Sequence, residues 1–167
     1  GLNISALSAD FPGLRLSDSR SIDERVERTC AILDLAADMS VPVVTAGVGA
    51  LPHPQTGEPS DAAVSALRRI GEFADSRDRV FAIRPSYDSV ERLSAVLAAV
   101  GCPWIRIGLD PAAMLMSGIN PLATMQQMGQ QVSLVHIRDG VPGHPDHPGQ
   151  ETRLGEGEVD LRGLLAS

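Results

Sequence analysis

Short apolar segments alternate along this chain with longer segments of helical periodicity. The apolar segments cover residues 2–8, 42–48, 80–85, 104–110 and 132–137. They are rich in Val, Ile and Leu, and they mostly lack the polar–apolar alternation of a half-exposed strand. We therefore predict five strands of a parallel sheet that is covered on both faces.

The intervening segments carry the start and stop signals of helices. Apolar residues recur there at spacings of three and four, and Gly101 and Gly129 follow two of these patterns as stop signals. The candidate start signals are a capping-box sequence at 21–24, Ser60, Asp88 or Ser89, Asn120 and Asp160. Strand–helix–strand alternation with right-handed crossovers makes successive strands neighbours in one parallel sheet.

The number of strand–helix units limits the fold. About five units in 167 residues are too few for a closed eight-stranded barrel, which takes about 200–250 residues. We predict an α/β fold of the parallel (β/α)8 TIM-barrel type that is incomplete. It would form a single domain over residues 1–167 that lacks N-terminal and C-terminal barrel elements. An open sheet is the alternative.

Two further expectations follow from this fold. The polar segment 140–157 contains three prolines, so we predict a long loop without regular structure. An incomplete barrel leaves sheet edges exposed, so we expect a homo-oligomer or a partner chain that completes the barrel.

Net charge and hydropathy limit the classes of partner and the cellular location that we expect. The net charge of -7 and the scattered arginines argue against nucleic acid as a partner. No apolar segment reaches the roughly 18–20 residues that cross a bilayer, so we expect no membrane partner. Cys30 and Cys102 are predicted to be buried free thiols, and no signal-peptide pattern is present. We therefore expect a cytoplasmic protein.

Polar residues stand where three of the predicted strands end: Arg84, Asp110 and His136. In a parallel barrel these ends, together with that of the first strand near Asp10, open onto one common mouth. Asp110 is a candidate metal ligand or general base, or the N-cap of a short helix that begins at the following proline. His136 is a candidate metal ligand, or a buried histidine bonded to a backbone carbonyl.

Arg84 does not fit a metal site, because its positive charge repels a divalent cation. It could form an ion pair with Asp110, or hold a substrate carboxylate or phosphate through its planar guanidinium. Asp139 could orient a substrate or cap a turn. Glu156 could contact a substrate hydroxyl or remain a solvated charge.

Four short motifs carry a family resemblance. They are AIRP at 82–85, GLDP at 108–111, VHIRD at 135–139 and LGEG at 154–157. In this order and spacing the chain resembles the xylose isomerase-like barrel superfamily, which includes sugar-phosphate isomerases and epimerases. The resemblance covers almost the whole chain and implies strands 3 to 7 of the barrel.

The resemblance also implies a metal site with missing ligands. Members of the superfamily typically bind a metal through Glu, Asp, His and Glu at the ends of four consecutive strands. Asp110 and His136 match the second and third ligands, Arg84 stands in place of the first, and the fourth would lie beyond this chain. We therefore expect weak binding or no binding of Mn²⁺, Mg²⁺ or Zn²⁺.

The implied function follows the same family. It is that of a sugar phosphate isomerase/epimerase-like protein that acts on or binds a sugar or polyol, with a degenerate metal site. Arg84, Asp139 and Glu156 are the candidate substrate-binding residues. The alternative is a noncatalytic carbohydrate- or anion-binding relative of the same fold. Catalysis itself stays open, because two of the four expected ligands are absent.

Overall fold

Five parallel strands form one curved sheet in the order of the chain. The computed structural model describes residues 2–14, 16, 20–49, 51, 58–84, 89–144 and 146–166. The strands are β1 (Ala6–Ser8), β2 (Val43–Gly47), β3 (Val80–Arg84), β4 (Ile105–Leu109) and β5 (Val132–Val135). Each strand pairs in parallel with the next. This arrangement is part of a TIM barrel and confirms the predicted incomplete α/β barrel.

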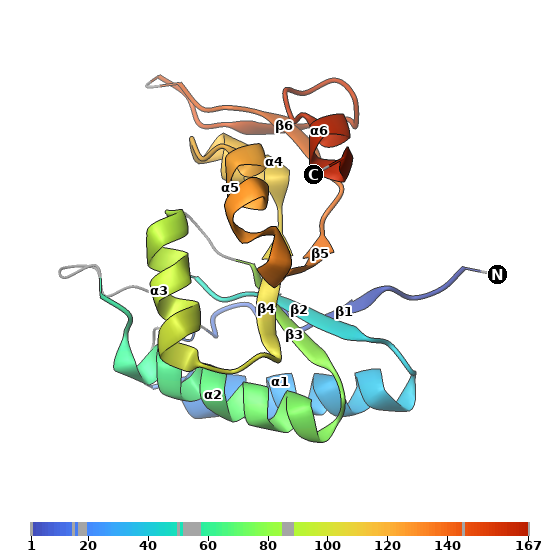
Figure 1. Cartoon of the computed structure of the whole chain (residues 1–167), viewed down its shortest axis with the longest axis vertical. Coiled ribbons are helices and arrows are strands. Elements are labelled where there is room, and N and C mark those ends of the chain that lie inside the picture. Colours follow the sequence, from blue (N-terminus) through green and yellow to red (C-terminus); the bar gives the residue numbers. More distant parts are fainter. Residues whose placement is uncertain are drawn as a thin grey trace.

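Helices connect the strands where the periodicity predicts them. They are α1 (Ile22–Asp38), α2 (Asp61–Ser76), α3 (Val90–Val100), α4 (Pro111–Met116), α5 (Pro121–Met128) and α6 (Leu161–Ala166), with a 3-10 turn at Gly129–Gln131. Figure 1 shows α1 and α2 side by side along one side of the sheet. No helix of the described ranges is long and apolar enough to cross a membrane.

Capping residues explain where several helices begin or end. Ser89 Oγ accepts a hydrogen bond from Arg92 N at the start of α3, and Gly101 ends that helix with a positive φ of 62°. Asn120 Oδ1 accepts hydrogen bonds from two amides of the first turn of α5. The helix α1 begins one residue after Ser21, as predicted, although that N-cap makes no side-chain capping bond among the described residues. The alternative start at Asp88 lies outside the described residues.

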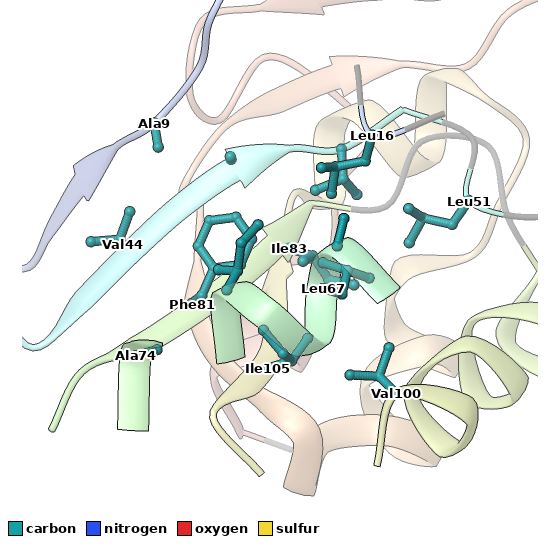
Figure 2. Packing of buried hydrophobic residues seen from close by; sticks show 14 of the residues in the cluster. Ala9, Leu16, Val44, Leu51, Leu67, Ala74, Phe81, Ile83, Val100 and Ile105 are labelled. Carbon is teal, nitrogen blue, oxygen red and sulfur yellow. The ribbon is translucent and has the colours of Figure 1, made fainter. Parts of the chain in front are cut away.

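The main core lies between the sheet and the helices α1 to α3. Val44, Phe81 and Ile83 on neighbouring strands are fully buried, and Leu67 of α2 packs in the same cluster. Figure 2 shows the side chains of Val44 and Phe81 together in this core, beside residues of α2. Because β2 and β3 are buried on both faces, their sequences lack polar alternation.

The prediction that residues 140–157 lack regular structure is wrong. A strand β6 (Asp139–Val141) pairs antiparallel with β7 (Gln150–Thr152) to form a hairpin. Pro142 and Pro148 lie just outside the paired residues, where a missing N–H removes no ladder hydrogen bond. The third proline of the segment, Pro145, lies outside the described residues. Figure 1 shows the hairpin above α4, at the end of the molecule opposite α1 and α2.

A partner that completes the sheet stays a prediction. Within the described residues, β1 and β5 each have a neighbour on one side only, since they end the strand order. Such edges present unpaired backbone groups to which another strand can bond.

Candidate functional site

The polar candidates lie together at the carboxyl-terminal end of the sheet, where the parallel strands end. Asp10 follows β1, Arg84 ends β3, Asp110 follows β4 and His136 follows β5. The charges of Asp10, Arg84 and Asp110 all act on the His136 imidazole, which places the four residues in one electrostatic neighbourhood. We call this set, together with Arg138, the mouth.

Arg84 pairs with Asp10, not with Asp110, the partner that the sequence suggested. Arg84 Nη2 donates a hydrogen bond to Asp10 Oδ2. Asp10 also accepts bonds from Ser8 Oγ at 2.7 Å and from Gly47 N at 2.7 Å. Burial raises the pKa of the Asp10 carboxyl, but the bonds from Ser8, Gly47 and Arg84 together outweigh burial and lower it. Asp10 therefore ties together the ends of β1, β2 and β3 as an anion.

Two strand glycines lie beside this ion pair. Gly47 lies directly opposite Arg84 in the register of β2 and β3. A Cβ added at Gly108 of β4 would lie 3.0 Å from Thr45 Oγ1 and 3.4 Å from Arg84 Cγ. The alkyl part of Arg84 therefore packs beside Gly108 of the neighbouring strand.

Both carboxylate oxygens of Asp110 are engaged. Asp110 Oδ1 accepts a hydrogen bond from Ala113 N at 3.0 Å, so the residue is the N-cap of α4, one of the two roles that the sequence allowed. Asp110 Oδ2 accepts a hydrogen bond from Arg138 Nη1 at 2.6 Å. The side chain of Asp110 is only 10% exposed, so water solvates this carboxylate little.

Arg138 connects the end of β4 to the hairpin. Its guanidinium bonds Glu151 of β7 twice, from Nε to Oε1 at 3.1 Å and from Nη2 to Oε2. The bonds to Glu151 and Asp110 raise the pKa of Arg138, although burial opposes them. Sequence reasoning missed both Arg138 and Glu151 as site residues. Arg138 had a signal, since it stands between two candidates in the VHIRD motif, but Glu151 had none.

One ring nitrogen of His136 has no hydrogen-bond partner among the described residues. Its backbone N–H donates to Leu109 O at 2.8 Å, which joins β5 to β4 beyond the last paired residues. Its Nε2 is buried and has no hydrogen-bond partner among the described residues. Burial lowers the pKa of His136, and the cationic Arg84 lowers it further. The imidazole is therefore neutral near pH 7, with one nitrogen that donates a hydrogen bond and one that accepts.

Asp139 holds the segment that follows the hairpin. It is 2% exposed, and its carboxylate accepts bonds from the backbone amides of Gly140, Gly155, Gly157 and Val159 at 2.8, 2.9, 3.0 and 3.1 Å. Burial raises the pKa of Asp139, but these bonds outweigh burial and lower it. Glu156 lies in the turn that these bonds hold and is exposed. Substrate binding by Asp139 and Glu156 stays a prediction.

The donors of the mouth do not fit a divalent metal as they are arranged. The described residues contain no group of three or more His, Cys, Asp or Glu side chains that could hold a metal ion. Asp110 is bonded to a guanidinium, and Arg84 contributes a positive charge instead of a ligand. Among these candidate ligand atoms, His136 Nε2 has no hydrogen-bond partner in the described part of the chain. We therefore derive no chemical step through a metal.

A separate cavity of about 400 Å³ lies between α4, α5 and α6. Its lining is mostly apolar, with Glu158 and Asp160 as its carboxylates. None of the mouth residues lines it, so we do not assign the candidate chemistry to this cavity.

Comparison with solved structures shows the same fold in longer chains. A xylose isomerase domain protein from Planctomyces limnophilus superposes with a TM-score of 0.87 at 20% identity, over 97% of this chain and 63% of that one. For a D-tagatose 3-epimerase-like protein the TM-score is 0.77 at 19% identity, over 96% and 64%. A xylose isomerase-like TIM barrel protein from Mycobacterium smegmatis in complex with magnesium gives 0.76 at 16% identity, over 99% and 62%. The chain thus spans less than two thirds of each of these proteins.

Sequence comparison assigns the family. No curated protein matches the chain. The family described as xylose isomerase-like TIM barrel matches it over residues 1–167. The whole of the described fold, from β1 to α6, falls within that match. The chain belongs to the xylose isomerase-like TIM barrel family.

Proposed function

We propose that the mouth binds a sugar or polyol, in a protein of the sugar phosphate isomerase/epimerase type whose metal site is degenerate. The observation that carries the proposal is the buried His136 Nε2, which has no partner among the described residues, in an imidazole that the charge of Arg84 reaches. A buried polar atom without a partner costs free energy unless a ligand or water bonds it. A sugar hydroxyl, which both donates and accepts, suits a neutral imidazole nitrogen in either tautomer.

Arg84 supplies further donors for such a ligand. It bonds Asp10 through Nη2, and its Nε and Nη1 make no hydrogen bond to the described residues. Its side chain is 24% exposed and therefore reachable from the mouth. Guanidinium N–H groups bond hydroxyl and carbonyl oxygens, and they bond carboxylates and phosphates more strongly.

The alternative is a noncatalytic relative that binds a carbohydrate or an anion. Arg84 supports it, because an arginine stands where the family resemblance implies a carboxylate ligand. Catalysis of the isomerase or epimerase type moves a proton next to a sugar carbonyl. The described mouth offers His136 as a neutral base, whereas both of its carboxylates are held in ion pairs.

Binding is tested by calorimetry with a panel of pentoses, hexoses, polyols and their phosphates, on the unaltered chain and on R84Q and H136F. We expect both substitutions to weaken binding. R79Q is the matched control, because Arg79 precedes β3 at its opposite end and is similarly shielded, at 19% exposed. If no compound binds, or if R79Q weakens binding as much as R84Q, the proposed mouth is wrong.

Catalysis is tested separately on any compound that binds. Incubation in D₂O followed by proton NMR detects exchange of the hydrogen next to the sugar carbonyl. Exchange that H136F abolishes supports an isomerase or epimerase. Binding without exchange supports the noncatalytic alternative.

A further inference from the structure

We infer that Arg138 is the resident cation of the mouth: its guanidinium takes the place on Asp110 that a divalent metal would take, and Glu151 fixes it there. The inference rests on the degenerate metal site proposed above and identifies the group that fills it. Its experiment measures metal affinity without any sugar, so it can fail or succeed independently of sugar binding.

Each carboxylate oxygen of Asp110 already accepts a hydrogen bond. Oδ1 is bonded to Ala113 N at 3.0 Å, and Oδ2 is bonded to Arg138 Nη1 at 2.6 Å. A metal ligated by Asp110 Oδ2 would lie next to the guanidinium of Arg138, whose positive charge repels a divalent cation. The ion pair is also shielded, since the Asp110 side chain is 10% exposed and that of Arg138 is 36% exposed.

Arg138 is held in position from its other side. Nε and Nη2 bond the two carboxylate oxygens of Glu151, so all three guanidinium nitrogens of Arg138 are engaged. This planar, two-point contact is the arrangement that best fixes an arginine. A metal that displaces Arg138 from Asp110 would have to rotate the guanidinium away from Glu151 or leave it next to the metal.

The hairpin that carries this contact is itself anchored. Arg138 directly precedes β6, and Glu151 lies opposite Gly140 in the register of β6 and β7. A Cβ added at Gly149 would lie 2.7 Å from the Cα of Met116, so the hairpin packs closely on α4. Asp110 is the N-cap of that same helix. The guanidinium and the carboxylate are therefore both held by the contact between hairpin and helix.

The charges of the mouth balance without a metal. When its charged neighbours Glu151 and Arg25 are counted with it, the described anions are Asp10, Asp110 and Glu151, and the described cations are Arg25, Arg84 and Arg138. Arg25 is 1% exposed and donates to Gly47 O at 3.3 Å, and the amide of the same glycine bonds Asp10. A divalent cation would thus enter a site that already has a cation for each carboxylate.

Because of this ion pair, restoring metal binding should require substitutions at both Arg84 and Arg138. Restoring the missing carboxylate by R84E alone leaves Arg138 on Asp110, so we expect no strong gain in metal affinity. Removing the charge of Arg138 by R138Q alone frees Asp110 but leaves Arg84 in the mouth. The two changes together leave a carboxylate at position 84, Asp110 and His136 as oxygen and nitrogen ligands, the types that Mn²⁺ and Zn²⁺ accept.

The test is a titration with Mn²⁺, in which the electron paramagnetic resonance signal of the free ion reports binding. The proteins are the unaltered chain, R84E, R138Q and the double variant R84E/R138Q. R84E/R153Q is the control for loss of an exposed arginine, since Arg153 directly follows β7. We expect the double variant to bind at least about tenfold more tightly than either single variant, because a neighbouring cation is removed and a ligand is gained. The control is expected to bind like R84E.

A second double variant controls for a folding defect caused by the loss of Arg138. R84E/E151Q keeps Arg138 but removes its ion pair with Glu151, and we expect its affinity for Mn²⁺ to lie between those of R84E and R84E/R138Q. Circular dichroism establishes that each variant is folded. The inference is overturned if the folded double variant binds no more tightly than R84E, or if the unaltered chain binds Mn²⁺ with micromolar affinity.

Discussion

The substitution G157A tests the role of Asp139 in holding the segment after the hairpin. Gly157 packs directly on the Asp139 carboxylate and donates its amide to Oδ2 at 3.0 Å. A Cβ added at Gly157 would contact Oδ1 and would lie 2.6 Å from Asp139 Cγ and 2.6 Å from Gly140 N. These distances are too short for carbon, so either the turn or the carboxylate must move.

The expected cost follows from these contacts. Inserting a methyl group into a packed site costs about 1–3 kcal/mol. Neither Asp139 nor the Gly140 amide is the free end of a flexible chain, because backbone amides hold the carboxylate from four directions. At roughly 2–4 °C per kcal/mol for a chain of this size, the midpoint of thermal unfolding should fall by about 2–12 °C.

Thermal unfolding followed by circular dichroism measures this change, and amide hydrogen exchange by NMR locates it. We expect faster exchange at Gly155 and Val159, whose amides bond the same carboxylate. G129A is the control, since a Cβ there would meet only Met125 Sδ at 3.7 Å. An unchanged midpoint together with unchanged exchange at these amides would refute the role assigned to Asp139.

Three further predictions concern the core, the acid stability and a helix cap. Phe81 is fully buried, so F81A should lower the free energy of unfolding in urea by about 3–5 kcal/mol, and a loss below about 1 kcal/mol would contradict the described core. The pKa of Asp139 is lowered on folding, because the backbone hydrogen bonds outweigh burial. Its contribution to stability is therefore present above the unfolded-state pKa of about 3.9 and is lost as the pH falls through the folded-state value. Between about pH 6 and about pH 3, the midpoint of thermal unfolding should fall less steeply with pH in D139N than in the unaltered chain. An equally steep fall in both proteins would mean that other groups cause the loss of stability in acid. Asn120 Oδ1 accepts two amides of α5, so N120A should cost about 0.5–2 kcal/mol in the same urea assay, whereas no cost would mean that the cap is not formed.

The strands could be predicted from sequence because burial on both faces of a parallel sheet leaves a strong local signal. Segment 80–85 contains the observed Val80–Arg84, and segment 132–137 contains Val132–Val135. The first strand is shorter than predicted: Leu2 and Ile4 are exposed, and only Ala6–Ser8 pairs with β2. The hairpin was missed because its polar residues and prolines resemble those of a loop.

The site could be predicted only in part, because its ion pairs join residues far apart in sequence. Strand ends identified Arg84, Asp110 and His136 as neighbours of one mouth. Arg84 bonds a residue 74 positions away, and Arg138 bonds one that is 28 positions away. Local sequence patterns do not predict such ion pairs, because the two residues of each pair become neighbours only in the folded chain.

The most direct test of the central claim is a calorimetric titration of the unaltered chain with Mn²⁺ at neutral pH. The claim is that guanidinium groups, not a divalent metal, neutralise the carboxylates of the mouth. The account predicts no binding, or binding in the millimolar range or weaker. Micromolar binding that is lost in D110N would contradict it.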